Sequence, residues 1–281
     1  MKELLHQAKV RDATVAGIFY PDDPEELESR ISALLQAAKP SVTKATVIFS
    51  PHAGLDYSGD LSALAWKSAE GSRIESVLVL APLHRAEESF IYLPESDYYE
   101  LPTGRIRVDH ETVSELGDCG TLMNINDIPH LQDHGIELQL PFMLDLFPDA
   151  RLVPILVGKS SPAVIRALAS ALSLVFSDRV QSTLIVISSD IGSSNEERVA
   201  ALVADRFLRS FLDEDSTSIA EDIEAGNISA CGSACVAAYL MSGLAGSKRP
   251  VLLGRHDSSA SREMGEERLV HYAAVAFADA D

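Results

Sequence analysis

Short, continuously apolar runs recur along this chain, and they constrain its fold more than any other feature of the sequence. Unbroken apolarity, unlike strict alternation, is typical of β-strands that are covered on both faces. The six runs are Ala45–Ser50, Ser76–Ala81, Leu152–Val157, Thr183–Ser188, Pro250–Leu253 and Tyr272–Phe277. Between them lie segments with helical periodicity, namely Asp23–Lys39, Asp60–Ala69, Pro162–Phe176, Glu196–Leu212, Ile219–Glu224 and Gly232–Gly243. Strands that alternate with helices predict an α/β fold in which helices cover a mostly parallel central sheet.

The composition fits one globular domain over residues 1–281, because no linker-like or low-complexity tract divides the chain. Apolar residues make up 46% and charged residues 23% of the 281 residues, enough for a core without disulfides. The cysteines, Cys119, Cys231 and Cys235, lack metal-finger spacing and indicate a reducing compartment. The start of the chain has no apolar signal core, and no apolar run approaches a membrane span. We therefore expect a cytoplasmic protein.

Acidic residues outnumber basic residues by 42 to 23, which gives a formal net charge of −19. This excess of negative charge repels phosphate backbones and anionic lipids, so we expect neither nucleic acid nor a membrane as a partner. A homodimer is expected only because dimers are the commonest assemblies of soluble proteins.

Three residues that can bind a metal follow three of the apolar runs. His52 comes after the first run, His84 after the second and Asp190 after the fourth. Ligands of open parallel sheets bind beyond the carboxyl ends of the strands, so these side chains would converge if the strands are neighbours. Imidazole and carboxylate groups are typical ligands of Fe(II), Mn, Zn or Cu. Each residue taken alone also fits a turn or a helix cap.

Cys231 is a further candidate, because it directly precedes the helical pattern that opens at Gly232. A thiol at the positive end of a helix is expected to have a lowered pKa and to be a better ligand or nucleophile. The alternative is a small buried hydrophobe, which is the role we expect for Cys235 and Cys119.

The segment around His134 and Glu137 places two titratable residues three positions apart, where they would share a helix face. Such a pair can supply acid/base catalysis or orient a metal ligand. Pro141 is expected to end or kink this helix. The alternative is a solvated polar face on an amphipathic helix. Tyr57 fits either the wall of a substrate pocket or an ordinary loop.

Five segments, in this order, resemble the MEMO family, whose prokaryotic members are called AmmeMemoRadiSam system protein B. They are Val15–Pro21, Pro51–Gly59, Asp133–Phe142, Ser188–Asp190 and Cys231–Gly232. The resemblance extends from Arg11 to about Phe277. It implies a fold similar to the class III extradiol dioxygenases (the LigB-like family), which bind non-haem Fe(II) at the sheet ends.

Carried over to this sequence, the resemblance implies a metal-facing set with acid/base groups beside it. The metal-facing residues would be His52, His84 and Cys231, with Asp190 adjacent and His134 and Glu137 nearby. Fe(II) is the favoured metal, and Cu or Zn are alternatives. A soft thiolate in place of a carboxylate ligand alters redox behaviour, so the resemblance does not by itself imply ring cleavage.

The sequence departs from the family pattern at Ser193, where members commonly carry His, and at Leu83 and Gly135, where they commonly carry Ser. Three functions therefore stay open. The first is a metal-dependent, dioxygenase-like oxidoreductase acting on an unknown small substrate. The second is a zinc hydrolase with Glu137 or His134 as its base. The third is a non-enzymatic module that binds a peptide or protein. The family name alone suggests radical-SAM and AMMECR1-like proteins as partners.

Overall fold

A mixed nine-stranded sheet forms the centre of the protein in a computed structural model that describes residues 8–260 and 268–279. Eight of its strands follow the order β10-β12-β2-β9-β3-β8-β4-β7, and β11 pairs with β12. The four middle strands are parallel, and every one of them was predicted from an apolar run. They are β2 (Val47–Ser50), β9 (Thr183–Ser188), β3 (Ser76–Pro82) and β8 (Arg151–Val157).

The outer strands make the sheet mixed rather than wholly parallel. The last two predicted strands are longer than expected and pair with each other in an antiparallel manner. Residues 258–268 connect these two strands. Because this connection is too short for the crossover that parallel strands need, the strands pair in an antiparallel manner. The remaining sheet strands, β4, β7 and β10, are short and were not predicted. The bounds are β11 Lys248–Asp257, β12 Leu269–Asp279, β4 Ile91–Leu93, β7 Met123–Ile125 and β10 Gly192–Ser194.

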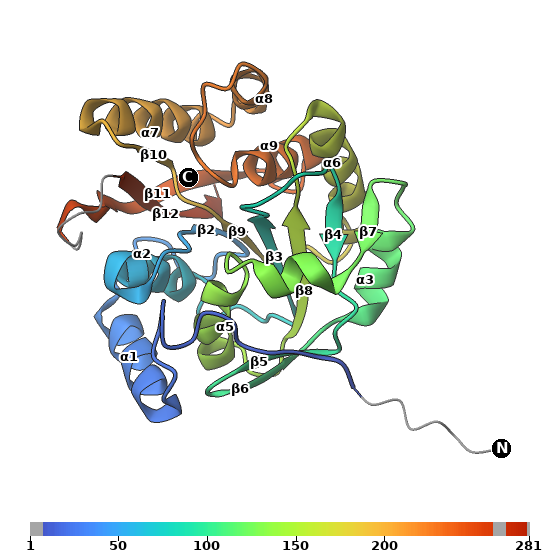
Figure 1. The fold of residues 1–281 in the computed structure, drawn as a ribbon, viewed down its shortest axis with the longest axis vertical. Helices are drawn as coiled ribbons and strands as arrows, with labels where there is room; N and C mark the ends of the chain where they lie inside the picture. Colours follow the sequence, from blue (N-terminus) through green and yellow to red (C-terminus); the bar gives the residue numbers. More distant parts are fainter. Residues whose placement is uncertain (1–7, 261–267, 280–281) are drawn as a thin grey trace.

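Helices cover both faces of the sheet (Figure 1). One layer contains α1 (Pro24–Ala37), α2 (Leu55–Ser68) and α5 (Leu140–Leu146). The other contains α6 (Pro162–Phe176), α7 (Glu197–Leu212), α8 (Ser216–Glu224) and α9 (Ser233–Ser242), while α3 (His110–Gly117) packs against α6 and β8. The predicted α/β architecture is confirmed, and the buried apolar residues form one continuous core.

Local signals in the sequence explain where the helices begin. The side chain of Asp23 accepts a hydrogen bond from the backbone N–H of Glu26, and Pro24 occupies the first turn of α1, as predicted. Helix α2 was predicted from Asp60 but begins at Leu55, directly after Gly54. The early start places Tyr57 on a helix instead of a loop.

A small second sheet and two short helices lie beside the main layers. The sheet has the order β1-β5-β6, with β1 parallel and β6 antiparallel to β5. Its strands and the neighbouring helices are β1 Val10–Arg11, β5 Tyr98–Leu101, β6 Gly104–Arg107, α4 Asp127–Gln132 and the 3-10 helix Glu137–Gln139. A second 3-10 turn spans Ser258–Ala260.

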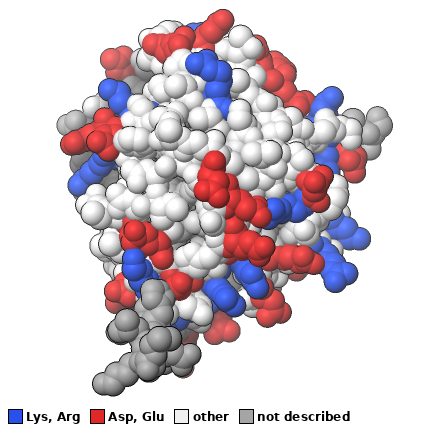
Figure 2. Space-filling view, turned by 90° about the vertical axis from the view of Figure 1, so that its right-hand side faces the viewer, with Lys and Arg blue, Asp and Glu red and all other residues white. Residues whose placement is uncertain are grey.

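Acidic and basic side chains are interspersed on the face drawn in Figure 2, and a broad uncharged area lies beside them. The coloured residues of that face form no extended basic area. In the part of the chain that the structure describes, no helix combines the length and apolarity needed to cross a membrane.

Candidate metal centre

Three side chains from distant parts of the sequence meet beyond the carboxyl ends of the parallel strands. His52 follows β2 and His84 follows β3, and these two strands flank β9. Cys231 comes from the loop before α9. One ligand atom from each residue lies within 4.8 Å of the others, and Cys231 Sγ is 3.1 Å from His52 Nε2. This spacing and donor set fit one bound metal ion.

The imidazole of His52 is held by a chain of buried polar groups. Its Nδ1 lies 2.9 Å from the hydroxyl of Ser188, which donates its single proton to the carbonyl of Gly135. Ser188 must therefore accept from His52 Nδ1–H, which leaves the lone pair of Nε2 directed toward Cys231. Gln139 donates to the same hydroxyl at 3.0 Å and accepts from the indole N–H of Trp66 at 2.9 Å.

Asp133 orients the second imidazole. Its carboxylate accepts from the backbone N–H of His84 at 2.7 Å and from His84 Nδ1 at 3.0 Å. The other carboxylate oxygen accepts from the backbone N–H of Gly135 at 2.9 Å. Because a carboxylate only accepts, Nδ1 of His84 carries the proton and Nε2 is the nitrogen available to a metal. This is the carboxylate–histidine arrangement common around metal ligands.

Burial and neighbouring groups shift the pKa of each of the three candidate ligands. It lowers the pKa of His52 to about 4, with a further contribution from His84. Burial also lowers the pKa of His84, but hydrogen bonds with Asp133 and Cys231 outweigh it and raise this pKa to about 10. Burial and the charge of Asp190 raise the pKa of Cys231 to about 11. The expected lowering of the Cys231 pKa was wrong, because burial of the thiol and the neighbouring charge of Asp190 outweigh the groups that lower it, His84 and Ser189.

Asp190 lies beside the cluster and fixes the loop that carries the thiol. Its carboxylate accepts from the backbone N–H of Cys231 at 2.8 Å, and its own N–H points to Cys231 Sγ at 3.4 Å. Gly232 lets this loop approach the end of β9, because a Cβ there would lie 2.6 Å from Cβ of Ser189. Asp190 is outside the three-residue group whose ligand atoms lie close together.

His134 is the remaining imidazole at this edge. Its ring is stacked between two others, 4.4 Å from His84 and 5.0 Å from Phe19 between centroids. Burial and the two neighbouring histidines lower its pKa to about 4, which keeps the ring neutral at pH 7. A second group that could hold a metal ion consists of His84, Asp133 and His134. His134 thus lies against His84, at the edge of the candidate centre.

Glu137 lies three residues after His134, but its side chain contacts the segment ahead of α1. Its fully buried carboxylate forms an ion pair with Arg11 and accepts from the backbone N–H groups of Thr14 and Val15 and from the hydroxyl of Tyr20. Burial opposes its ionisation, but Arg11 and the hydrogen bonds lower its pKa. These contacts anchor the segment before α1 against the site.

The predicted shared helix face of His134 and Glu137 was wrong. His134 lies in the loop after α4, and Glu137 begins a 3-10 helix. Pro141 stands in the first turn of α5 and neither ends nor kinks a helix. A proline is tolerated there because the first backbone N–H groups of a helix have no partner within it.

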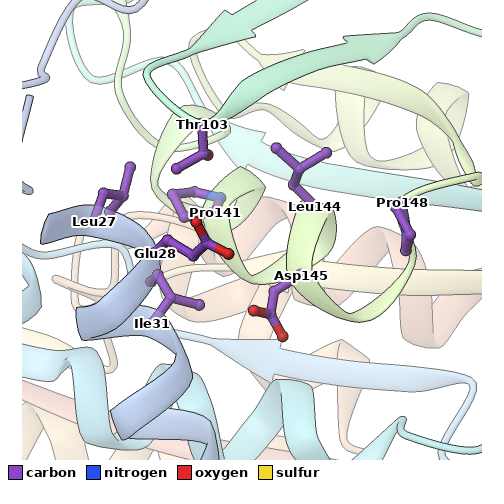
Figure 3. Close-up of a pocket in the computed structure, with 8 residues that line it drawn as sticks. All are labelled: Leu27, Glu28, Ile31, Thr103, Pro141, Leu144, Asp145 and Pro148. Atoms are coloured by element: carbon purple, nitrogen blue, oxygen red, sulfur yellow. The ribbon is translucent and has the colours of Figure 1, made fainter. Parts of the chain in front are cut away.

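Two cavities adjoin this region. One of about 140 Å³ is lined by His84, Cys231 and Lys159, among others. The other, of about 490 Å³, is lined by Tyr57 and Phe19 and by Ala53, the residue after His52. A separate cavity of about 330 Å³ between α1 and α5 contains Glu28, Asp145 and Pro141 in its wall, as Figure 3 shows. None of the predicted site residues lines that third cavity.

The family model of the Memo-like proteins matches residues 11–276. This chain belongs to the Memo-like protein family. The predicted resemblance to the MEMO family is thereby confirmed.

Relatives of this Memo-like protein include two archaeal proteins named MEMO1 family protein. That of Metallosphaera sedula is 27% identical over 96% of this chain and 99% of its own, and that of Ignicoccus hospitalis is 28% identical over 95% and 98%. A third protein with this name, from Thermotoga neapolitana, is 29% identical over 82% of this chain and 87% of its own. Among solved structures, an uncharacterised protein from Escherichia coli K12 is 12% identical, with a TM-score of 0.43, over 82% of this chain and 98% of that one.

The residues that orient the imidazoles were not predicted as site residues. Asp133, Ser188 and Gln139 all lie inside the segments on which the family resemblance rests, and this is the signal that could have identified them. Nothing in the sequence around Arg11, the partner of Glu137, distinguishes it from other basic residues such as Lys9. Arg11 is 1% exposed, and a buried arginine requires a carboxylate partner.

Proposed function

We propose that this Memo-like protein is a metal-dependent oxidoreductase that holds one ion through His52, His84 and Cys231. The observation that carries the proposal is the placement of three ligand atoms within 4.8 Å, from three separate segments. Two imidazoles and a thiolate suit Fe(II), which we propose as the resident metal, and Cu or Zn fit the same donors. When bound, such an ion can exchange an electron or polarise a bound group.

The surrounding residues prepare the ligands for this role. Ser188 and Asp133 hold the two imidazoles in the tautomers that expose Nε2. A metal requires neutral imidazoles and a thiolate, so binding must release protons from the site and strengthen as pH rises. His134 is neutral at pH 7 and stacked on His84, so it can accept a proton or hold one next to the centre.

Zinc-dependent hydrolysis is the second candidate function. The same three donors leave room for a fourth ligand at a catalytic zinc, where a bound water becomes a nucleophile. Of the two bases considered for this reaction, His134 adjoins the centre, whereas the carboxylate of Glu137 is occupied by Arg11 and the N-terminal segment. A hydrolase on this site would therefore depend on His134.

The proposal is tested by measuring the metal content and metal affinity of the protein. The protein is purified anaerobically, with a purification tag that binds no metal. His52→Ala, His84→Ala and Cys231→Ala should each lose the one equivalent of iron that the parent binds. His110→Ala and Cys119→Ala, which change the same residue types away from the centre, should keep it. Retention of zinc without oxygen uptake favours the hydrolase. Absence of stoichiometric metal in the parent refutes both functions and leaves a binding module.

A further inference from the structure

The cavity of about 490 Å³ beside the centre has the properties of a ligand site. Most of its lining is apolar, contributed by Phe19, Tyr57, Tyr272, Ile18 and Val270 among others. Its volume and apolar character are those of pockets that take small organic molecules. The aromatic side chains offer flat surfaces on which a flat molecule can stack.

Arg268 is the charged residue in this lining. Its Nε and Nη2 both donate to the hydroxyl of Ser193, at 3.0 and 2.6 Å, which fixes the plane of the guanidinium group. Within the described part of the chain, its hydrogen bonds go to Ser193 and to no carboxylate. A guanidinium has five N–H donors, so the group held by Ser193 can still bind a carboxylate in a fork.

The cavity and the metal centre share a wall. Phe19 lines the cavity, and its ring is stacked on His134, which is in turn stacked on the ligand candidate His84. Ala53 and Gly54, the two residues after His52, line the same cavity. A molecule lying on the cavity side of Phe19 is therefore separated from His84 by the stacked rings of Phe19 and His134.

The charges select the kind of ligand. The net charge of −19 disfavours multiply charged anions, while one oriented guanidinium favours one negative charge. We propose that the cavity binds an organic monocarboxylate with a flat apolar body, its carboxylate on Arg268 and its body against Phe19 and Tyr57. The binding requires no metal. That such compounds are the substrates of the centre rests on the proposed function.

Binding of 2-naphthoate and of its neutral analogue 2-naphthamide to the full-length protein, measured by titration calorimetry before and after removal of metal by a chelator, tests this proposal. The parent should bind naphthoate about tenfold more tightly than naphthamide, the effect expected of a charge-assisted hydrogen bond. Arg268→Gln should abolish this preference and leave naphthamide binding unchanged. Ile18→Ser, at an exposed residue of the lining, should weaken both probes by a similar factor.

Arg255→Gln is the matched control, because it removes an equal charge from an arginine on β11 that pairs with Asp205. This variant should keep the preference of the parent. Equal affinities of the parent for the two probes, no binding of either, or an Arg268→Gln variant that still prefers naphthoate would overturn the proposal. A parent that prefers naphthoate but binds no metal supports the carboxylate site and refutes only the proposed oxidoreductase.

Discussion

Asp133→Asn probes how the protein prepares His84 for a metal. The native carboxylate accepts three N–H groups, from the backbone and Nδ1 of His84 and from the backbone of Gly135. An amide has only one acceptor oxygen, so its NH₂ group must replace one carboxylate oxygen. If the NH₂ group is turned toward Gly135, it faces the backbone N–H of Gly135, and two buried donors are left without an acceptor. If the NH₂ group is turned toward His84, it donates to Nδ1 of the imidazole. The imidazole proton then moves to Nε2, which is the nitrogen that the metal needs.

The magnitudes follow from these two outcomes. A buried donor without an acceptor costs about 1–3 kcal/mol of unfolding free energy. Loss of a carboxylate that orients a metal-ligating histidine costs about 10- to 100-fold in metal affinity. We therefore expect Asp133→Asn to lower the free energy of unfolding, measured by urea unfolding, and the metal affinity, measured by competition with a chromophoric chelator.

Asp60→Asn is the matched control, since Asp60 pairs with His256 at 2.9 Å on the surface. Its metal affinity should equal that of the parent, and its stability should change by less than about 1 kcal/mol. If Asp133→Asn binds metal as tightly as the parent and unfolds at the same urea concentration, the role assigned to Asp133 is refuted.

Three further predictions concern the buried polar groups. Ser188→Ala removes the acceptor of His52 Nδ1 and should weaken metal binding about tenfold; an unchanged chelator competition would contradict this. Glu137→Gln leaves the buried cation of Arg11 uncompensated and should cost about 3–5 kcal/mol in urea unfolding; a cost under about 1 kcal/mol would show that the ion pair is dispensable. Burial lowers the pKa of His130 from 6.5 to about 4, so an unfolded chain takes up a proton below pH 6.5 that the folded chain does not. Stability should therefore fall by about 3 kcal/mol from pH 6.5 to 4 through this group, and His130→Gln should fall less steeply than the parent; equal slopes would exclude His130 as the cause.

The buried strands and the edge at which the site lies could be predicted because both depend on local sequence. Continuous apolar runs such as Thr183–Ser188 identify strands covered on two faces, and a residue after such a run lies at the sheet edge by geometry alone. The short strands β4 and β7 could not be predicted in this way. Their few residues carry no periodic signal, and their pairing depends on neighbours that are distant in the sequence.

The fine structure of the site depends on such distant contacts. Asp133 and His84 are 49 positions apart, and Glu137 meets Arg11 across 126 positions. Spacing within the segment suggested a helix that would align His134 with Glu137. Instead, the carboxylate pairs with the buried Arg11, and the imidazole lies on a loop. Local periodicity contains no information about which buried charge will require a partner.

X-ray absorption spectroscopy of the protein loaded with one equivalent of Fe(II) or Zn(II) identifies the atoms bound to the metal, and so tests whether His52, His84 and Cys231 hold it. We expect one sulfur ligand, at about 2.3 Å for zinc, together with imidazole nitrogens, and loss of the sulfur signal in Cys231→Ala. A first shell without sulfur in the parent, or a sulfur signal that persists in Cys231→Ala, would contradict a centre formed by His52, His84 and Cys231.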